Sequence, residues 1–342
     1  MTIGRELKVT ALGTKVSGKT TFLLGMYAEL SAGGPHGYFL NAPDPDVDLD
    51  LGSRWDRLLD DGILPERTGA DVIPYHFQFL DGIRPLIDID WFDYRGGALT
   101  DAVEGSSGDV AELHARLQDS DCVYLVVDGG YLVDPISREV VRGTLAKTGL
   151  KRMSSLLQTV IQKKVQAEEP PPTLVLLITK SDVIPQRRRE DLTSLSDDLR
   201  MLIPLAFTDG ITTLVCPVTV GNFGLDDPSQ VSVEEIDPHG LHLPIVFSLA
   251  EYMRQLALAA AYAGTAVGGR VAELEEELRA LNTGVFRNRS KIGLARTELA
   301  SIEEDQATYG YVFEQAAKRA EMLFGELGGL LVFRDGEAAT DV

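Results

Sequence analysis

The sequence predicts an α/β protein in which a mostly parallel sheet is covered by helices and followed by a helical hairpin. Three observations support this fold class. Apolar runs of strand length alternate with helix-like segments up to about residue 250, as in βαβ units. A glycine-rich loop joins the first apolar run to a helix, which is typical of a phosphate-binding α/β domain. Beyond residue 250 the chain becomes rich in Ala, Glu, Leu and Arg, and no further strand is indicated.

Six segments have the composition of strands, and four of them are near-continuous apolar runs typical of strands buried on both faces. The six are 7–12, 75–80, 86–92, 122–127, 174–179 and 212–218. Segment 75–80 (YHFQFL) alternates and is followed by a short turn, so we expect an edge strand in a hairpin with 86–92. Helix-like segments lie between the strands, at 20–31, 98–118, 143–167 and 190–206.

The composition restricts the classes of function that we expect. The net charge of −20 over 342 residues argues against binding to nucleic acid as the main activity. The two cysteines, Cys122 and Cys216, lie in strand-like runs and are expected to be reduced core residues. No apolar stretch reaches the about 18–20 residues of a membrane span, and the N-terminus lacks the apolar core of a secretion signal. We therefore expect a cytoplasmic protein.

Residues 13–20, GTKVSGKT, fit the phosphate-loop pattern G-x-x-x-x-G-K-[ST] between a strand and a helix. The glycines permit a tight loop whose backbone N–H groups surround phosphates at a helix N-terminus. Lys19 would reach the β- and γ-phosphates, and the Thr20 hydroxyl would bind Mg²⁺. The alternative is a glycine-rich turn with an incidental lysine, which the strand–loop–helix context disfavours. The candidate nucleotide-binding residues here are Gly13, Thr14, Lys15, Val16, Ser17, Gly18, Lys19, Thr20 and Thr21.

A carboxylate at the end of a neighbouring strand is the second requirement of such a site. Asp93 ends the run LIDIDWF and is followed by Gly96, so Asp93 can hold Mg²⁺ through water while the Gly96 amide contacts the γ-phosphate. Asp88 and Asp90 share one face of this strand, because they are two residues apart. We favour a polar edge or a salt-bridged pair for these two.

The tetrapeptide TKSD follows another apolar strand and contains Thr179, Lys180 and Asp182. An aspartate here can accept two hydrogen bonds from guanine N1–H and N2–H₂, which adenine does not donate in that pattern. Lys180 would lay its aliphatic part along the base. Taken alone, a helix N-cap explains the tetrapeptide equally well. Its position after the two phosphate motifs favours a guanine site.

The order GTKVSGKT, DYRG, TKSD resembles the GTPases of the translation-factor, Ras and dynamin class over residues 7 to about 250. The resemblance implies a three-layer P-loop GTPase domain over residues 1–250, with a mostly parallel six-stranded sheet and with GTP or GDP and Mg²⁺ as cofactors. Asp128 resembles the aspartate that often ends the intervening strand, and Thr219–Val220–Gly221 resembles the loop whose amide binds guanine O6. WFDYRGGAL and the insert before it are closer to divergent bacterial GTPases, the double-GTPase and dynamin-like relatives, than to compact Ras proteins.

The chain departs from this class at the residue that positions the attacking water. Small GTPases usually place a glutamine directly after the glycine of the DYRG-type motif, whereas this chain has Gly97. We therefore expect hydrolysis to be slow alone, or to depend on a cation from Lys15, Arg67, Arg95 or a partner's arginine. Lys15 is equally compatible with being an exposed lysine without a catalytic role.

A polar insert of about 40 residues separates the first helix from segment 75–80, and so long a segment without strand signals is usually functional or disordered. It contains Thr68, a few residues before the edge strand, where the family carries a threonine that closes on Mg²⁺ and the γ-phosphate. An ordinary loop threonine is the alternative. Loops that order on GTP and loosen on GDP are a standard switching device.

Residues 251–330 are expected to form a helical or coiled-coil extension, because Val271, Leu274, Leu278 and Leu281 keep a spacing of three to four residues. The extension can transmit the nucleotide state, dimerise, bind an effector or simply cap the first domain. Its tip carries a basic turn, for which we favour a solvated helix end over membrane contact on so acidic a chain. Residues 331–342 are expected to be a disordered acidic tail. The basic residues at the tip are Arg287, Arg289, Lys291 and Arg296. A second basic group, Arg187, Arg188 and Arg189, follows TKSD and is compatible with a partner surface or with simple charge balance.

The leading hypothesis is a guanine-nucleotide switch that binds GTP and Mg²⁺, hydrolyses GTP slowly, and signals to a protein effector or activating partner. Three rivals remain: an ATP-using enzyme with the same phosphate loop, a non-hydrolysing nucleotide-bound scaffold, and a self-assembling dynamin-like GTPase. Gly97 is the best argument for the scaffold, and TKSD argues against the ATP-using enzyme. A homodimer, through the first domain or the helices, is compatible with the leading hypothesis.

Overall fold

The computed structural model describes residues 6–34, 37–65, 73–94, 107–224, 230–283 and 289–339. The chain forms two compact units. Unit 1 contains Met1–Ser248 and Gly325–Val342, and unit 2 contains Leu249–Phe324.

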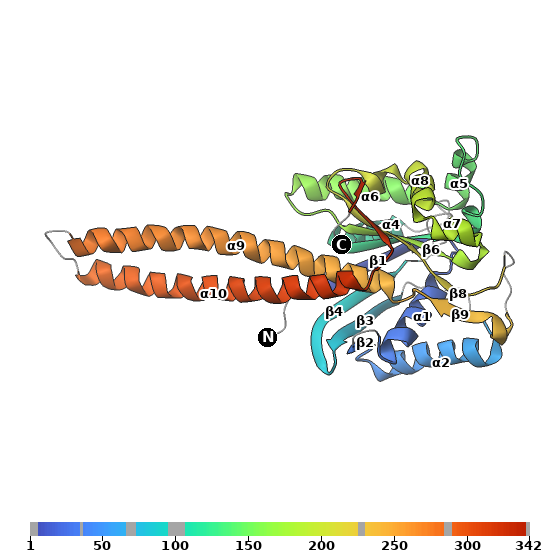
Figure 1. Cartoon of the computed structure of the whole chain (residues 1–342), viewed down its shortest axis with the longest axis horizontal. Helices are drawn as coiled ribbons and strands as arrows, with labels where there is room; N and C mark the ends of the chain where they lie inside the picture. Colours follow the sequence, from blue (N-terminus) through green and yellow to red (C-terminus); the bar gives the residue numbers. More distant parts are fainter. Residues whose placement is uncertain are drawn as a thin grey trace. The chain divides into compact units, whose positions relative to one another are not determined.

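Unit 1 is built on a sheet of nine described strands in the order β11-β10-β7-β6-β5-β1-β4-β3-β2 (Figure 1). The strands are β1 (Leu7–Gly13), β2 (Tyr38–Asn41), β3 (Ile73–Asp81), β4 (Arg84–Asp93), β5 (Cys122–Asp128), β6 (Thr173–Thr179), β7 (Thr212–Pro217), β10 (Leu331–Arg334) and β11 (Glu337–Ala338). The central strands β4, β1, β5, β6 and β7 run parallel, and the two strands at each edge pair antiparallel. A separate two-stranded sheet joins β8 (Thr219–Gly221) to β9 (Ile236–His239).

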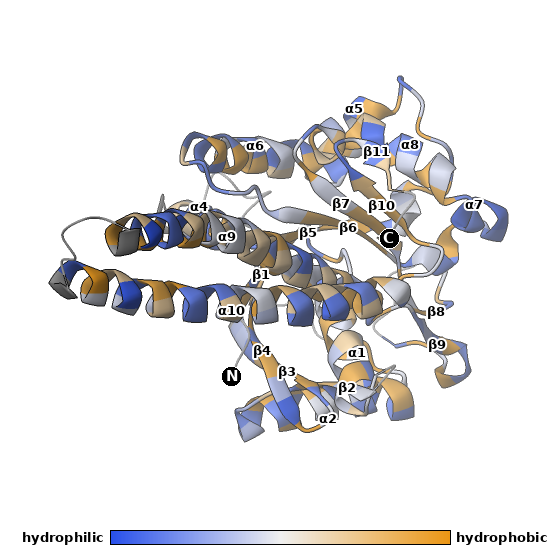
Figure 2. Ribbon diagram, turned by 60° about the vertical axis from the view of Figure 1, so that its left-hand side comes forward, coloured by the Kyte–Doolittle hydropathy of each residue, from blue (hydrophilic) through white to orange (hydrophobic). Residues whose placement is uncertain are grey.

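Helices cover both faces of the large sheet, as the alternating apolar runs predict. They are α1 (Lys19–Ser31), α2 (Pro45–Asp61), α4 (Ser107–Asp119), α5 (Val141–Lys147), α6 (Leu150–Gln166), α7 (Gln186–Glu190) and α8 (Leu192–Leu202). Side chains of α4, α6 and α8 form one buried hydrophobic cluster with side chains of β5 and β6. These two strands are coloured as hydrophobic in the centre of Figure 2. On the other face, Phe22 of α1 packs against Trp91 and Tyr124 at ring-centroid distances of 6.2 and 6.3 Å. The expected α/β class with a mostly parallel sheet is confirmed.

The sheet is larger than the six strands expected, partly because the polar insert contains regular structure. Residues 38–41 form edge strand β2, which pairs with β3. Segment 75–80 therefore forms the expected hairpin with β4, but the expectation that it is an edge strand is wrong. Helix α2 follows β2, with the Asp44 carboxylate accepting a hydrogen bond from the Asp46 amide at its N-terminus and Gly62 in a left-handed conformation at its C-terminus. Leu51, Trp55 and Leu58 of α2 are buried. A helical spacing of apolar side chains thus lies within an acidic segment.

Two expected helices are divided. The segment 143–167 forms α5 and α6, which are separated at Gly149, whose φ of 68° no helix accommodates. The segment 190–206 begins earlier, as α7, continues as α8, and ends in a 3₁₀ turn over Pro204–Phe207. Cys122 and Cys216 are both buried and are not disulfide-bonded, as expected.

The expectation of a disordered tail from residue 331 is wrong for its first residues. Leu331–Arg334 form β10, which pairs antiparallel with β7 and covers the edge of the parallel sheet. Phe333 is 5% exposed and packs edge-to-face on Phe207 at 4.9 Å. Two hydrogen bonds hold the turn after β10. The Asp335 carboxylate accepts from the Gly210 amide at 2.8 Å, and the Gly336 carbonyl accepts from the Arg200 guanidinium at 2.9 Å.

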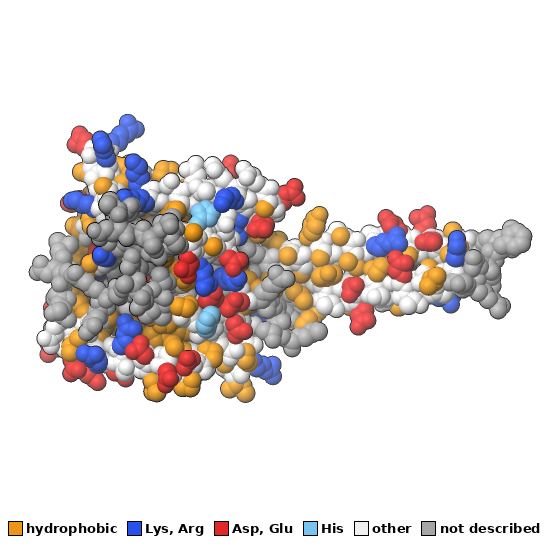
Figure 3. All heavy atoms as spheres, turned by 180° about the vertical axis from the view of Figure 1, so that it is seen from behind, with side chains coloured by type: hydrophobic (Ala, Val, Ile, Leu, Met, Phe, Trp, Pro, Cys, Tyr) orange, Lys and Arg blue, Asp and Glu red, His pale blue; other side chains and the backbone are white. Residues whose placement is uncertain are grey.

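Unit 2 is a pair of long helices, formed by α9 (Leu243–Thr283), whose first turns belong to unit 1, and α10 (Arg289–Gly325). Leu274 and Leu278 are buried in this pair, as their spacing predicts. Where Gly264 and Gly268 face α10, added Cβ atoms would lie 3.6 Å from Tyr309 and 3.2 Å from Gln306. Arg270 bridges the two helices by an ion pair with Glu298 at 2.9 Å. In the face shown in Figure 3, hydrophobic side chains are scattered along the two helices, and acidic and basic side chains gather mostly toward their far end. Within the described residues no helix is long and apolar enough to cross a membrane.

Candidate functional site

The candidate site lies where four parallel strands of unit 1 end. β1 ends at Gly13, β4 at Asp93, β5 at Asp128 and β6 at Thr179. The strand register places Ala11 beside Asp93 and Asp128 beside Thr179, so the ends of these strands lie at one edge. This carboxyl edge is where open α/β sheets bind ligands.

The loop between β1 and α1 has a backbone that ordinary residues rarely adopt. Val16 and Gly18 have φ angles of 67° and 79°. A left-handed conformation is costly for a β-branched residue such as Val16, and strain of this kind is typical of functional sites. A Cβ added to Gly13 would lie 2.7 Å from the Ser17 hydroxyl oxygen and 3.0 Å from Val126. Gly13 is therefore required for the close approach of this loop to the sheet.

Lys19, the first residue of α1, closes the loop. Its ammonium donates hydrogen bonds to the Gly13 carbonyl at 3.0 Å and to the Thr14 carbonyl at 3.2 Å. Burial lowers the pKa of Lys19, and the nearby Asp93 carboxylate opposes this shift. The Ser17 hydroxyl is buried in the same loop without a hydrogen-bond partner in the described part of the chain. An anion in the loop would supply both the charge and the acceptor that these groups require.

Asp93 is the acidic group of the site. The residue is 5% exposed, and its Oδ1 atom has no hydrogen-bond partner among the residues that the structure describes. Burial raises the pKa of Asp93 to about 6, and Lys19 opposes the shift. A buried carboxylate oxygen without a partner is costly, and a cation with its water shell would satisfy it. Asp93 and the first turn of α1, where Thr20 lies, therefore suit the Mg²⁺ ion that the sequence predicts.

Thr179 joins the phosphate loop to the predicted guanine motif. Its hydroxyl donates to the Ser17 carbonyl at 2.7 Å, with a longer contact to the Val127 carbonyl at 3.3 Å. A Cβ on Gly18 would lie 3.3 Å from the Thr179 side chain, so the loop passes directly over the end of β6. The sequence placed both motifs at the site but did not predict this bond, since its partners are 162 positions apart.

Lys180 and Asp128 form an ion pair at 2.8 Å that the sequence did not assign. Lys180 has a left-handed φ of 50°, and its side chain is one-third exposed. A Cβ on Gly129 would lie 2.6 Å from the Lys180 carbonyl, so this glycine permits the two strand ends to meet. Asp128 ends β5 and is followed by two glycines, but no local pattern in the sequence pairs it with Lys180.

Asp182 lies in a short 3₁₀ turn after β6, and both of its carboxylate oxygens are held. The Thr219 hydroxyl donates to Oδ1 at 3.0 Å, and the Phe223 amide donates to Oδ2 at 3.2 Å. Thr219 and Val220 belong to β8, so the structure brings the predicted O6 loop to Asp182. Phe223 was missed, because no sequence pattern marks its amide.

The remaining predicted residues divide into two groups. Lys15 is exposed on the loop and Thr21 lies in the first turn of α1. Outside the described residues lie Arg67, Thr68, Arg95, Gly96 and Gly97. Sequence reasoning also missed Gly149, at the start of α6, where a Cβ would lie 3.0 Å from the Thr14 methyl group.

Arg188, which the sequence left between a partner surface and simple charge balance, has a structural contact. Its guanidinium forms an ion pair with Asp198, and both side chains are largely buried. It also donates from Nε to the Leu132 carbonyl at 2.9 Å. Arg188 therefore ties α7 and α8 to the segment after β5.

Comparison with known proteins gives one family and a distant likeness. A protein-family model described as Double-GTPase 2 matches residues 8–213. No curated protein matches the sequence. Two solved structures of the S. cerevisiae Ski7 GTPase-like domain, bound to GTP or to GDP and inorganic phosphate, are 18% and 17% identical, with TM-scores of 0.32 and 0.30. The matches cover 67% and 62% of this chain, and the chain spans less than half of those structures, 46% and 43%.

Proposed function

The chain belongs to the Double-GTPase 2 family and is a divergent P-loop GTPase, and from this premise we propose that it is a guanine-nucleotide switch that binds GTP with Mg²⁺ and hydrolyses it slowly. The observation that carries the proposal is the bond between Thr179 and the Ser17 carbonyl. It links the phosphate loop directly to the motif that contains Asp182. A single nucleotide can therefore occupy both parts at once, with its phosphates in the loop and its base beside Asp182.

The phosphates would be bound by backbone N–H groups of residues 13–21 and by the Lys19 ammonium. Lys19 already lies over two carbonyls of the loop, at 3.0 and 3.2 Å. Thr20 and Asp93 would hold Mg²⁺, joined by Thr68, and the Gly96 amide would contact the γ-phosphate. When bound, the cation neutralises charge on the β- and γ-phosphate oxygens.

Guanine would be selected by Asp182. A carboxylate has about four acceptor positions, and two are engaged by Thr219 and Phe223. The other two can accept N1–H and N2–H₂ of guanine, whereas adenine offers an acceptor at N1 and would leave these two positions of the carboxylate unpaired. Lys180 would lie along the base, and the Thr219–Val220 segment would present an amide to O6.

Hydrolysis joins water to the γ-phosphorus and releases GDP and phosphate. Gly97 offers no side chain to orient that water, so we propose a slow intrinsic rate that rises when a cation is supplied. Lys15 on the exposed part of the loop and Arg67 are the candidates in this chain, and an arginine of a protein partner is the candidate in trans. We further propose that the chain signals to an effector in the cytoplasm through its switch loops and its helical extension. Homodimerisation is one form that this contact can take.

The nucleotide that copurifies with the protein tests the proposal. Denaturing the purified protein and separating the released nucleotides by ion-exchange chromatography should give GDP or GTP. Lys19→Ala should release none, because the loop loses its ammonium, whereas Lys163→Ala on the exposed face of α6 should retain the nucleotide. Recovery of adenine nucleotides from the wild-type protein would contradict the guanine assignment.

Phosphate release tests the enzymatic part separately. The wild-type protein with GTP should release phosphate only when Mg²⁺ is present, and Lys15→Ala should slow release without weakening GDP binding. If no Mg²⁺-dependent release occurs, alone or at concentrations that permit dimerisation, the chain is a nucleotide-bound scaffold.

A further inference from the structure

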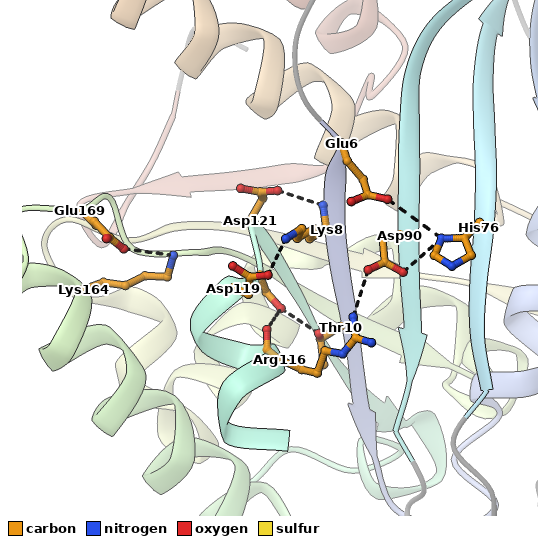
Figure 4. Close-up of polar contacts among 11 residues, drawn as sticks. Glu6, Lys8, Thr10, His76, Asp90, Arg116, Asp119, Asp121, Lys164 and Glu169 are labelled. Atoms are coloured by element: carbon orange, nitrogen blue, oxygen red, sulfur yellow. Dashed lines mark hydrogen bonds and ion pairs between the residues drawn. The ribbon is translucent and has the colours of Figure 1, made fainter. Parts of the chain in front are cut away.

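Three side chains, two from neighbouring strands and one from the residue before a third, face one another on unit 1, away from the strand ends that form the nucleotide site (Figure 4). They are Glu6, directly before β1, His76 of β3 and Asp90 of β4, and their nearest ligand atoms all lie within 4.8 Å of one another. We propose that these residues bind a divalent transition-metal cation, best matched by Zn²⁺. This inference is independent of the proposed nucleotide switch.

Asp90 provides the strongest support for a cation at this cluster. The residue is 7% exposed, and its Oδ1 atom has no hydrogen-bond partner among the described residues. That atom lies 3.5 Å from His76 Nδ1, so the two potential ligand atoms face each other. A buried carboxylate oxygen normally has a hydrogen bond or a coordinated cation.

The orientation of Asp90 is fixed from behind. Its other oxygen, Oδ2, pairs with the Arg116 guanidinium of α4 at 3.1 Å. Arg116 in turn packs over the Phe92 ring, 4.9 Å from its centroid. A ligating carboxylate is commonly held in this way by a second group, which leaves the first oxygen to the cation.

The strand register supports the geometry. His76 lies directly opposite Asp90 across the β3–β4 pair, and Lys8 lies opposite Asp90 across β1–β4, so residues of these rows share one face. Zn²⁺ bonds to N and O ligands are about 2.0–2.1 Å long, so two tetrahedral ligands are about 3.3–3.4 Å apart. The His76–Asp90 separation of 3.5 Å is close to that value. Glu6 Oε1 lies 4.0 Å from His76 Nδ1. Rotation of the half-exposed Glu6 side chain would bring this oxygen to the same cation.

The charges around the cluster favour a cation. Glu6 and Asp90 carry two negative charges and Arg116 one positive charge, which leaves a net negative charge, while the Lys8 ammonium is paired with Asp119. A neutral imidazole with two carboxylates suits Zn²⁺, with water in the fourth position, whereas Mg²⁺ prefers oxygen ligands alone. The ion would crosslink β1, β3 and β4, and it is distinct from the Mg²⁺ proposed at Asp93.

Zinc titration of the whole chain tests the assignment. The protein is treated with chelator, freed of nucleotide and kept in excess Mg²⁺, so that any site for hard cations is filled. Calorimetry with Zn²⁺ should then give one equivalent, and Co²⁺ should produce the visible absorption bands of a four-coordinate site. Loss of a supporting residue alone typically costs about 10- to 100-fold in metal affinity, so His76→Ala should cost about 100-fold or more.

Two further variants make the result decisive. His239→Ala is the matched control, because His239 also pairs with a carboxylate, Asp237 at 2.9 Å, but belongs to no three-ligand group in the described chain. It should bind Zn²⁺ like the wild type. Glu6→Gln should weaken binding, and both Glu6 and His76 are exposed enough for their variants to fold. Absence of stoichiometric binding by the wild type, or equal affinity in His76→Ala, would overturn the proposal and leave a polar cluster that binds no metal.

Discussion

At Asp93, Ser17 and Val16, unpartnered buried polar atoms and an uncommon backbone conformation gather at the carboxyl edge of the sheet. The Asp93 Oδ1 atom and the Ser17 hydroxyl oxygen are buried and have no hydrogen-bond partner among the described residues. Val16 adopts a left-handed backbone conformation. Each feature costs stability in the isolated chain. Their concentration within one loop and one strand end is expected for a binding site and not for a structural turn.

Replacing Asp93 tests this cost. The pKa of Asp93 rises from 3.8 to about 6 on folding, so the folded state binds more protons than the unfolded state between these values. Stability of the metal-free, nucleotide-free protein should therefore fall as pH rises through this range, by up to about 3 kcal/mol. Asp93→Asn removes the titration. Relative to wild type, its unfolding free energy should be higher at about pH 7, and the gain should shrink to about half at about pH 5.

Urea unfolding followed by tryptophan fluorescence measures this difference, since the two tryptophans, Trp55 and Trp91, both lie in unit 1. Part of the gain is offset because the buried Lys19 ammonium loses its counter-charge. A difference between variant and wild type that does not change with pH would contradict the assigned titration.

Thr179→Val tests the bond between phosphate loop and guanine motif. Valine keeps the shape but leaves the Ser17 carbonyl without the Thr179 hydroxyl, and an unsatisfied buried acceptor costs about 1–3 kcal/mol. GDP affinity should fall with stability, and Thr179→Ser should restore both. Thr159→Val, whose hydroxyl contacts Ser155 on an exposed helix face, should change stability by less than about 0.5 kcal/mol. Equal GDP affinity in Thr179→Val and Thr179→Ser would show that the bond does not matter for binding.

Individual residues were predictable from sequence where a local pattern specifies them. The spacing of Gly13, Gly18 and Lys19 identifies the phosphate loop, because the tight turn and the ammonium are needed at those positions. Phe223 was not predictable, since it contributes a backbone amide to Asp182 from 41 positions away. The Lys180–Asp128 pair depends likewise on the meeting of β5 and β6 at their ends.

At the scale of elements, sequence patterns identified the buried strands and missed the edges. β5 and β6 are almost entirely buried, so their apolar runs are continuous. β2 is a four-residue edge strand and β10 a four-residue strand next to the opposite edge, both with mixed burial, and so short a pattern is not distinguishable from a loop. α2 was missed because proline, glycine and aspartate dominate the segment in which Leu51, Trp55 and Leu58 lie.

Strand β10, which lies between β7 and β11, has a measurable role. Phe333→Ala should destabilise unit 1 by about 3–4 kcal/mol, because the ring is buried against Phe207 and leaves a cavity when removed. Phe313→Ala is the matched control, since that ring is 41% exposed on α10, and its cost should be below about 1 kcal/mol. Chemical unfolding monitored at Trp55 and Trp91 compares the two. Equal costs would mean that β10 does not stabilise the sheet.

For the whole molecule, the sequence correctly predicted the α/β class with C-terminal helices and the relation to P-loop GTPases. A chain with a net charge of −20 repels an anionic nucleotide at long range. In the proposed function, binding would therefore rest on local groups, namely backbone N–H groups, Lys19 and a cation beside Asp93. Because those groups are common to P-loop proteins, guanine specificity would depend on Asp182 and its neighbours.

The most direct test of this account is the base preference of the nucleotide-free protein and of Asp182→Asn, measured as competitive affinities for GDP, ADP and xanthosine diphosphate. Asparagine replaces one acceptor by an NH₂ donor, and xanthine carries a carbonyl where guanine carries its 2-amino group. The wild type should prefer GDP over ADP by about 100-fold or more. Asp182→Asn should lose GDP affinity and gain affinity for xanthosine diphosphate. An ADP affinity equal to that for GDP, or an unchanged preference in Asp182→Asn, would contradict a guanine-nucleotide switch.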